Sequence, residues 1–421
     1  MSALARYLLD CGKKVAGSDT YNGDYVKDLQ RSGIEVCIGN QRESVAEYDV
    51  VVYTDAIQEN DIQLCEARAL GKLVVSRGQF LYEVSRDFKN VIAVSGCHGK
   101  TTCTAMLAHI FVAANKKFCV HIGGKDLKYG NYYGCGKDYF ITEACEYKKN
   151  FLLLKPDTAV VLNSRPDHIE CYGSEENLKR SYSQFSESAN IKINLYGDIE
   201  AGGLTFGFDK NADYCAVNIA ESDGYYSFKV FEGGVELGKI CLNIYGKHNI
   251  LNALAAVAVA RSAQISFKAI QSGISDFKGV ERRFETLGVQ NGVKYIADYA
   301  HHPDEIRASL RTAKKVTSGK IFVVFQPHTY SRTKNLMKQF IKVLSAQNNL
   351  LIYRTYAARE YYDDAGSALT LAQRIKKSRY GDNRQDIVDF ISKTCKGDTV
   401  LFIGAGDIYD IAKEIVKNLY S

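Results

Sequence analysis

The stretch VIAVSGCHGKTTCTAML, residues 91–107, carries the strongest structural signal in the chain. Its apolar start, residues 91–94, predicts a buried strand, and the apolar residues 105–111 predict a buried helix. Between them lies a glycine loop that ends in Lys100 and Thr101. Such a loop turns backbone N–H groups towards a phosphate, and the helix N-terminus adds its positive dipole. The stretch therefore predicts a phosphate-binding loop within an α/β fold.

The loop departs from the full phosphate-loop pattern at one position. A glycine is expected five residues before Gly99, and Val94 stands there, so the loop has the shorter form G-x-x-G-K-T-T. The alternative to a phosphate loop is an ordinary glycine turn with a solvated lysine. The strand before the loop and the helix after it make this alternative less favourable, because a phosphate loop has the same order of elements. In a phosphate loop, Lys100 contacts the β- and γ-phosphates, and the Thr101 hydroxyl binds Mg²⁺.

Composition limits the class of protein. A chain of 421 residues, 46% hydrophobic and 24% charged, is long enough for several globular domains. The net charge of +6 suits anionic small substrates and does not indicate nucleic acid. No apolar run is long enough to span a membrane, and the N-terminus does not resemble a signal peptide. The 12 cysteines form no C-x-x-C pair and no metal spacing, so we expect reduced thiols in a cytoplasmic protein.

Three α/β domains are expected, at residues 1–88, 89–278 and 279–421. The first alternates helices and short strands, which predicts a parallel sheet. It opens on a helix at Ser2–Asp10, where a doubly wound domain opens with a strand and a glycine loop. We therefore expect its first strand and glycine loop to be missing, with a true start upstream of Met1 or a damaged ligand site as the two explanations. Its other expected elements are strands at 14–20, 34–39, 49–57 and 72–76 and helices at 24–32 and 61–70.

The other two domains show the same alternation. In the middle domain, strands are expected from Tyr139 and from Thr158, a helix capped by Ser174, antiparallel hairpins over 204–245, and an apolar helix within 246–263. In the last domain, strands that end in polar turns are expected from Val293, Lys320, Asn349 and Asp398, with a helix from Pro303.

Two residues of the middle domain are candidate metal ligands. Glu143 ends a buried strand, and the carboxyl ends of parallel strands are where ligand sites form, so its carboxylate can reach an Mg²⁺ at the loop. A strand-end surface acid is the alternative. His168 follows the next strand and is a candidate ligand for a second metal, although an ordinary loop histidine is favoured on position alone.

Further candidates are polar residues near helix starts and strand ends. Asn249 and Asn252 lie one turn apart on the same face of a helix, beside His248. Carboxamides in this arrangement can form hydrogen bonds with the edge of adenine. The alternative is that one asparagine caps the helix and the other packs in the core. Arg282 and Arg283 form a basic pair that can reach a phosphate. The alternative is that both side chains are simply solvated. Residues 298–303 and 326–333 each follow a strand, at the edge where sites form.

The order and spacing of these residues resemble the Mur ligase family over nearly the whole chain. The matching motifs are GCHGKTT, PDH, HNILNALAA, GVERRFE, DYAHHP, QPHTYSRT and YAARE. DYAHHP and QPHTYSRT are the most specific, and they resemble the alanine-adding branch of that family. The resemblance implies a Rossmann-like N-terminal domain, here truncated, that binds UDP-sugar, a central ATPase-type α/β domain with the phosphate loop, and a Rossmann-like C-terminal domain.

The resemblance also implies roles, residue by residue. ATP is bound by Gly96, Cys97, His98, Gly99, Lys100, Thr101, Thr102, His248, Asn249, Asn252, Arg283 and Asp298. Mg²⁺ is held by Thr101, Glu143 and His168. Tyr299, His301 and Arg332 line the amino-acid site, and Ser18 and Asp19 lie at the nucleotide-sugar site. Lys100, Glu143, His168, Arg283 and His301 are the catalytic group.

The chemistry implied by the resemblance is amide-bond formation in peptidoglycan synthesis. The lactyl carboxylate of UDP-N-acetylmuramate attacks the γ-phosphate of ATP, and the amine of L-alanine then displaces phosphate from the acyl phosphate. Both steps gather negative charge, which Mg²⁺, a lysine and an arginine stabilise. A monomer or homodimer without nucleic-acid or membrane partners is expected.

Two further departures from the family pattern concern the middle domain. The segment at 186–203 is shorter than is usual, which puts the packing near that sheet edge in doubt, and Arg165 stands where an acid is usual beside PDH. The competing interpretations are a related ligase with another acceptor, such as one that recycles muropeptides, and a catalytically impaired nucleotide-binding relative. A nucleic-acid-dependent ATPase is a more distant alternative, because no basic stripe interleaved with aromatic residues is present.

Overall fold

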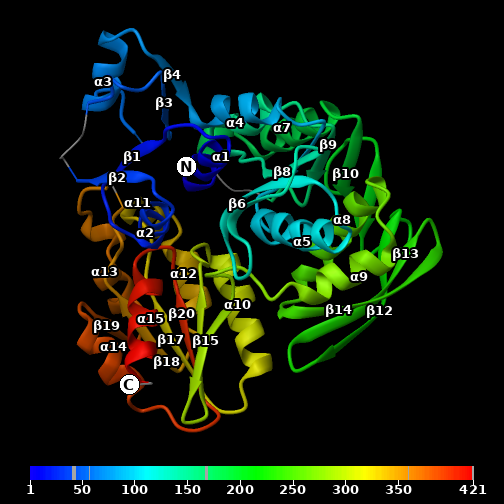
Figure 1. Cartoon of the computed structure of the whole chain (residues 1–421). Helices are drawn as coiled ribbons and strands as arrows, with labels where there is room; N and C mark the ends of the chain where they lie inside the picture. The colour runs from blue at the N-terminus through cyan, green and yellow to red at the C-terminus, as the bar shows by residue number, and fades with distance from the viewer. Residues whose placement is uncertain (40–43, 56, 166–168, 359, 420–421) are drawn as a thin grey trace. The chain divides into compact units, whose positions relative to one another are not determined.

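The computed structural model describes residues 1–39, 44–55, 57–165, 169–358 and 360–419 (Figure 1). They form two compact units. The first comprises Met1–Ala220, Ser227–Asn243 and His248–Lys278, and the second comprises Glu221–Tyr226, Ile244–Lys247 and Gly279–Ser421. The first unit contains both the expected first domain and most of the expected middle domain, so the border after residue 88 stays a prediction.

The N-terminal part of the first unit alternates helices and short strands, as predicted. Its elements are α1 (Ser2–Asp10), β1 (Ala16–Asp19), α2 (Asp24–Arg31), β2 (Glu35–Ile38), β3 (Val50–Tyr53), α3 (Ile62–Ala69), β4 (Leu73–Ser76) and α4 (Arg77–Ser85). The pairing is parallel, but it forms two separate two-stranded sheets, β1 with β2 and β3 with β4. Helix α4 begins with a capping box, in which the Ser76 and Gln79 side chains each accept a backbone N–H of the other residue.

A ten-stranded sheet dominates the rest of the first unit, in the order β14-β13-β12-β11-β10-β9-β5-β8-β6-β7. Its strands are β5 (Asn90–Ser95), β6 (Phe118–Asp126), β7 (Gly130–Gly134), β8 (Tyr139–Glu143), β9 (Thr158–Val161), β10 (Ile191–Leu195), β11 (Leu204–Gly207), β12 (Tyr214–Ser222), β13 (Tyr225–Glu232) and β14 (Val235–Tyr245). The helical segments are α5 (Lys100–Ala113), η1 (Tyr147–Leu153), α6 (Ile169–Tyr172), α7 (Glu175–Glu187), α8 (His248–Ser262) and α9 (Phe267–Asp276).

Strand β5 lies at the centre of this sheet, parallel to β8 on one side and to β9 on the other. Helices α5, α8 and α9 pack together on one face of the sheet (Figure 1). A second apolar cluster joins α1, α4 and α7 to the sheet and includes Tyr7, Leu81 and Phe185. Because helices cover both faces, β5 is buried on both, which explains its unbroken apolar run.

The hairpin prediction for residues 204–245 is wrong for its first pair. Strands β11 and β12 run parallel, with Phe206 opposite Tyr214. In an antiparallel pair, the chain would reverse its direction at 208–213. Here the segment 208–213 crosses back, so that β12 starts beside β11 and runs in the same direction. The later strands β13 and β14 are sheet neighbours joined by Gly233 and Gly234 alone, which is the length of a tight hairpin.

The shortened segment at 186–203 is well packed. Ser186 and Asn194 are buried, and the Ser186 hydroxyl donates to the Asn194 carboxamide oxygen at 3.0 Å. The Asn194 amide nitrogen in turn donates to the Gly202 carbonyl at 3.0 Å. Strand β10 inside this segment pairs in parallel with β9 and β11, so the sheet continues through it without a break.

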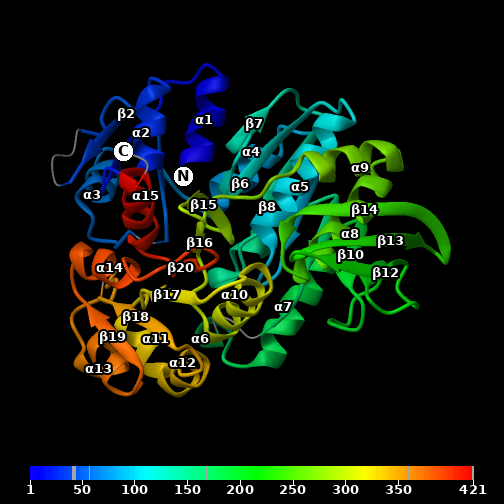
Figure 2. The same ribbon diagram turned by 90° about the horizontal axis from the view of Figure 1, so that it is seen from below.

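The second unit is a three-layer α/β domain, which confirms the Rossmann-like architecture that was predicted for it. Its six-stranded sheet has the order β15-β16-β20-β17-β18-β19, antiparallel at β15–β16 and parallel elsewhere. Figure 2 shows the sheet with α14 and α15 on one face and α12 and α13 on the other. The strands are β15 (Glu285–Gln290), β16 (Val293–Asp298), β17 (Ile321–Phe325), β18 (Asn349–Tyr353), β19 (Ser378–Gly381) and β20 (Thr399–Ile403). The helices are α10 (Pro303–Val316), α11 (Tyr330–Asn335), α12 (Met337–Leu344), η2 (Asp364–Gly366), α13 (Ala368–Gln373), α14 (Arg384–Ile391) and α15 (Ile408–Leu419).

A buried histidine fixes the helix that follows the phosphate loop. His109 of α5 lies with its Nδ1 2.9 Å from Asp276 of α9 and its Nε2 3.1 Å from Asp126 at the end of β6. The close packing of α5 on α9 also depends on Gly273, where an added Cβ would lie 2.4 Å from the Ile110 Cα. Across the described ranges, the helices are all too short or too polar to cross a membrane.

We expect Gly273→Ala to lower the free energy of unfolding by about 2 kcal/mol, because overpacking against the α5 backbone outweighs the helix propensity that alanine gains. Chemical unfolding of the variant and the parent measures this change. Gly202→Ala is the matched control, since an added Cβ there has no heavy atom within 4 Å. An unchanged or increased stability of Gly273→Ala would contradict the close α5–α9 contact.

Candidate functional site

The glycine loop between β5 and α5 has backbone geometry that requires its glycines. Gly96 and Gly99 adopt φ values of 135° and 89°, which side chains disfavour. An added Cβ would lie 3.1 Å from the Asn163 backbone nitrogen at Gly96, and 2.3 Å from the Asn252 side-chain oxygen at Gly99. The loop is therefore a closed turn at the N-terminus of α5, with no room for side chains at either glycine.

Asn163, two residues after the end of β9, fixes the shape of this loop. Its side-chain oxygen accepts the His98 N–H at 3.1 Å, and its amide nitrogen donates to the His98 carbonyl at 2.9 Å. The Cys97 thiol donates to the Arg165 carbonyl and lies 3.5 Å from the Tyr182 hydroxyl. The sequence analysis did not single out Asn163, and the parallel pairing of β9 with β5 is what brings it to the loop.

Lys100, the first residue of α5, forms a largely buried ion pair with Glu146. Its ammonium group lies 2.7 and 3.0 Å from the two carboxylate oxygens of Glu146, and 2.5 Å from the Gly96 carbonyl. The side chains are 16% and 4% exposed. Burial alone would lower the pKa of Lys100, but attraction to Glu146 outweighs it and raises the pKa, so Lys100 is a cation. The sequence analysis missed Glu146, although it lies only three residues after Glu143.

Thr101 and Glu143 come together as the candidate metal pair. The Thr101 hydroxyl donates to a Glu143 carboxylate oxygen at 3.1 Å, and the other oxygen accepts the Gly123 N–H at 2.6 Å. Strand β8 delivers Glu143 because it pairs in parallel with β5, with Glu143 opposite Val94. Hydroxyl and carboxylate oxygens are ligands that Mg²⁺ prefers.

The two asparagines of α8 lie against the phosphate loop. Both are 5% exposed, and the Asn252 amide nitrogen donates to the Asn249 side-chain oxygen at 2.8 Å. The position of Asn252 beside Gly99 places this pair at the loop itself, whereas His248 is exposed at the start of the helix. Recognition of adenine by these residues stays a prediction.

The residues present fit a nucleotide phosphate and a magnesium ion. The loop offers a glycine turn, a helix N-terminus and a buried lysine, and Thr101 and Glu143 offer oxygen ligands beside it. His168 lies outside the described residues, so its predicted metal role has no structural counterpart here. Among the residues that are described, no group of three or more His, Cys, Asp or Glu side chains forms a metal-binding cluster.

A second set of predicted site residues gathers at the carboxyl end of β16, in the second unit. Asp298 ends the strand and accepts a hydrogen bond from the Ser309 hydroxyl. Burial raises the pKa of Asp298 to about 6, although Ser309 and the Arg283 guanidinium oppose the rise. That guanidinium lies over the Tyr299 ring, 5.1 Å from its centroid.

His301 lies in the same turn as a neutral base. Its Nδ1 lies 3.0 Å from the Tyr299 carbonyl, which can only accept, so Nδ1 carries the proton and Nε2 carries the lone pair. Burial lowers the pKa of His301; Glu305 raises it, whereas Arg332 lowers it further. The imidazole is therefore uncharged near neutral pH.

His328 and Tyr356 are residues of this cluster that the sequence analysis did not single out. The Arg332 guanidinium donates to His328 Nδ1 at 3.1 Å, and the His328 ring lies 5.9 Å from that of His301 and stacks on Tyr356. Burial and then the neighbouring His301 lower the pKa of His328 to about 4. Both residues lie within the quoted motifs QPHTYSRT and YAARE, and this was the available signal.

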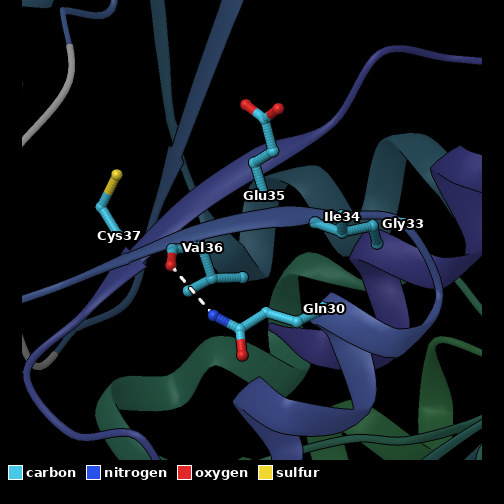
Figure 3. A pocket seen from close by; sticks show the side chains of 6 residues that line it. All are labelled: Gln30, Gly33, Ile34, Glu35, Val36 and Cys37. Atoms are coloured by element: carbon cyan, nitrogen blue, oxygen red, sulfur yellow. Dashed lines mark hydrogen bonds between the residues drawn. The ribbon is translucent and has the colours of Figure 1, made fainter.

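The predicted nucleotide-sugar residues are exposed on β1. The Ser18 hydroxyl donates to the Gln63 side chain at 2.6 Å, and an Asp19 oxygen accepts the Tyr21 N–H at 3.2 Å. A pocket of about 470 Å³ lies nearby, on the neighbouring strand β2 and helix α2 (Figure 3). Its lining residues are Gln30, Gly33, Ile34, Glu35, Val36 and Cys37. None of the predicted site residues lines this pocket, although Ser18 is opposite Cys37 in the β1–β2 pair.

Three domain families match the chain in the expected order. Residues 1–89 match the Mur ligase family catalytic domain, residues 94–260 match the Mur ligase middle domain, and residues 282–406 match the Mur ligase glutamate ligase domain. Relatives over the whole length agree, as the following comparisons show. The chain belongs to the Mur ligase family.

Among similar proteins of this family are UDP-N-acetylmuramate–L-alanine ligases. That of Clostridium acetobutylicum is 39% identical over 98% of this chain and 94% of its own length. That of Clostridium beijerinckii is 37% identical over 99% of this chain and 95% of its own length.

Solved structures show the same fold. The UDP-N-acetylmuramate–alanine ligase of Thermotoga maritima has a TM-score of 0.86 and 28% identity, with 100% of this chain and 96% of that chain covered. A murein peptide ligase from Psychrobacter arcticus has a TM-score of 0.74 at 23% identity, with 100% of this chain and 96% of that chain covered, which supports the fold alone.

The raised pKa of Asp298 predicts a pH-dependent stability. Between the unfolded value of 3.8 and the folded value of about 6, the folded chain binds more protons at this residue than the unfolded chain does. The contribution of Asp298 to the free energy of unfolding therefore falls by about 1–3 kcal/mol as the pH rises through this window. It levels off only once the pH is well above 6.

Asp298→Asn should remove this fall, so that the variant gains stability relative to the parent on going from pH 4.5 to pH 7. Urea unfolding at the two pH values measures the difference. Asp389→Asn, on the exposed side of α14, is the matched control. A parallel pH dependence of Asp298→Asn and the parent would show that Asp298 has an ordinary pKa.

Proposed function

We propose that the chain joins L-alanine to UDP-N-acetylmuramate at the expense of ATP, giving UDP-N-acetylmuramoyl-L-alanine, ADP and phosphate in peptidoglycan synthesis. The full-length similarity to ligases of that name supports this function. The structural observation that carries it is the phosphate loop, with buried Lys100 and the Thr101–Glu143 pair at the N-terminus of α5. These groups are what activation of a carboxylate by a nucleotide phosphate requires.

In this proposal the phosphate loop binds the triphosphate of ATP. Lys100 neutralises the β- and γ-phosphates, and Thr101 and Glu143, with His168, hold Mg²⁺. When bound, the metal ion supplies further positive charge to the phosphates. Asn249 and Asn252, with His248, are assigned to adenine, and Arg283 and Asp298 are assigned to ATP binding on the family resemblance alone.

The first chemical step forms a carboxyl–phosphate bond. A lactyl carboxylate oxygen of UDP-N-acetylmuramate attacks the γ-phosphorus, and the bond from that phosphorus to the β-phosphate oxygen breaks, so ADP leaves. The negative charge that spreads over the transferred phosphoryl group is stabilised by Lys100, and the family resemblance assigns Arg283 to the same role. In the second step, the alanine nitrogen attacks the acyl carbon and phosphate leaves.

The amine must lose a proton before it attacks, because an ammonium group has no lone pair. His301 is suited to accept that proton at Nε2, since its Nδ1 is committed to the Tyr299 carbonyl. Tyr299 and Arg332 lie beside it and line the proposed amino-acid site, where the guanidinium can pair with the alanine carboxylate. This assignment rests on geometry within the second unit alone.

We expect continued ADP release over many turnovers only when ATP, Mg²⁺, UDP-N-acetylmuramate and L-alanine are all present. A coupled ADP assay with each component omitted in turn tests this, and Lys100→Ala should lower turnover at least ~10³-fold, about 4 kcal/mol in the barrier. The reason is the loss of the cation that the first residue of α5 places at the phosphate loop.

Two outcomes of this assay would contradict the proposal. Turnover of Lys100→Ala within about tenfold of the parent would exclude the loop as the phosphate site. Full ADP release with a muropeptide acceptor in place of L-alanine would assign the chain to a recycling ligase. As a control, Lys89→Ala removes an exposed lysine that pairs with Asp138, and its turnover should be unchanged.

The neutral state of His301 predicts the acidic limb of the pH–rate profile. Activity should fall as the pH drops through the pKa of His301, which lies below its usual value of 6.5, because the protonated ring accepts no proton. His301→Gln should lose about 10²-fold in kcat/KM for L-alanine and should lose this limb. A variant with an unchanged pH–rate profile would show that His301 is not the base.

A further inference from the structure

The ammonium group of Lys100 has all its protons engaged within the loop. Its neighbours are the two Glu146 oxygens at 2.7 and 3.0 Å and the Gly96 carbonyl at 2.5 Å, with the Cys97 carbonyl further away at 3.5 Å. An ammonium group donates three hydrogen bonds. A nucleotide phosphate can therefore bind Lys100 only if one or more of these contacts is given up.

Glu146 is held in this position by its own backbone. Its carbonyl accepts the Lys149 N–H at 2.9 Å and the Tyr172 hydroxyl. The turn that follows is strained, because Lys148 and Lys149 adopt successive positive φ values of 51° and 60°. A glutamate that merely covered a surface lysine would not need a backbone fixed in this way.

The same turn is tied to the N-terminal part of the chain. The Asn150 amide nitrogen donates to an Asp55 carboxylate oxygen at 2.7 Å, in the loop after β3. Lys148 lies 3.9 Å from the other Asp55 oxygen, and an added Cβ at Gly78 would lie 2.9 Å from the Asn150 side-chain oxygen. Glu146 therefore belongs to a segment that is anchored at both ends and is not free to swing away from the loop.

We propose that Glu146 is a positioning residue that holds Lys100 in the nucleotide-free loop and competes with the nucleotide phosphates for its ammonium group. This inference rests on the proposed nucleotide site. Because Glu146 is fixed and buried, its negative charge stays close to the phosphates when they arrive and opposes their binding. After phosphoryl transfer, the return of Lys100 to Glu146 favours the departure of ADP.

Substitution of buried Glu146 should strengthen ligand binding, whereas substitution of a buried charged residue usually weakens it. Glu146→Gln keeps the shape of the side chain but removes its charge, so ADP should bind about five- to fiftyfold more tightly than it binds the parent. Adenosine, which has no phosphates, should show unchanged affinity. Damage to the fold of the loop would instead weaken both ligands, so the contrast between ADP and adenosine separates positioning from structure.

Isothermal titration calorimetry with ADP and with adenosine on the full-length chain measures these affinities. Glu83→Gln is the matched control, because it removes the same charge from an exposed pair with Arg86 on α4. Its ADP affinity should equal that of the parent. In steady-state assays, Glu146→Gln should lower both KM for ATP and kcat, since nucleotide binds more tightly and ADP leaves more slowly.

A second variant keeps the test decisive if Glu146→Gln does not fold. Glu146→Asp retains the charge but draws the carboxylate back from Lys100, so its ADP affinity should rise at least about twofold. Unchanged or weaker ADP binding by the folded variants would overturn the role of Glu146. If the parent itself binds no ADP, the proposed nucleotide site fails, and this outcome is distinct from equal binding by parent and variants.

Discussion

The parallel pairing of β5 between β8 and β9 is the constraint on which the candidate site depends. Parallel strands end at the same edge of a sheet, so the segments that follow these three strands meet there. Lys100 follows β5, Glu143 ends β8 with Glu146 just beyond it, and Asn163 follows β9. Hydrogen bonds among these segments then give the loop one shape: Asn163 clamps His98, and Glu146 binds Lys100.

The phosphate loop meets two opposing demands through this arrangement. A buried lysine without a partner is costly, so the empty loop needs an anion for Lys100. A loop that binds phosphate also needs that lysine to be available. The fixed carboxylate of Glu146 supplies the anion that Lys100 needs, but it also makes Lys100 less available to a phosphate. In this proposal, the strength of the Lys100–Glu146 ion pair therefore affects how tightly nucleotide is bound. Asn252 lies close to Gly99, and the α5 backbone lies close to Gly273, so both the loop and α5 are closely packed.

The second unit repeats the same principle with different chemistry. Strands β16 and β17 both pair in parallel with β20, so the turns that carry His301 and His328 meet at one edge of the sheet. Burial keeps both imidazoles uncharged, and Arg332 supplies the positive charge beside them. The cluster therefore combines a neutral base with a cation, which suits a substrate that carries both an amine and a carboxylate.

The sequence by itself determined the α/β class, the phosphate loop and the positions of most strands, because apolar periodicity and glycine spacing are local properties of the chain. It also indicated the family through motifs such as DYAHHP and QPHTYSRT. Only the tertiary structure decided that Glu146 is the partner of Lys100, that Asn252 lies against Gly99, and that β11 and β12 run parallel. Strand order and side-chain burial decide these contacts, and both depend on residues distant in the chain, which no local pattern records.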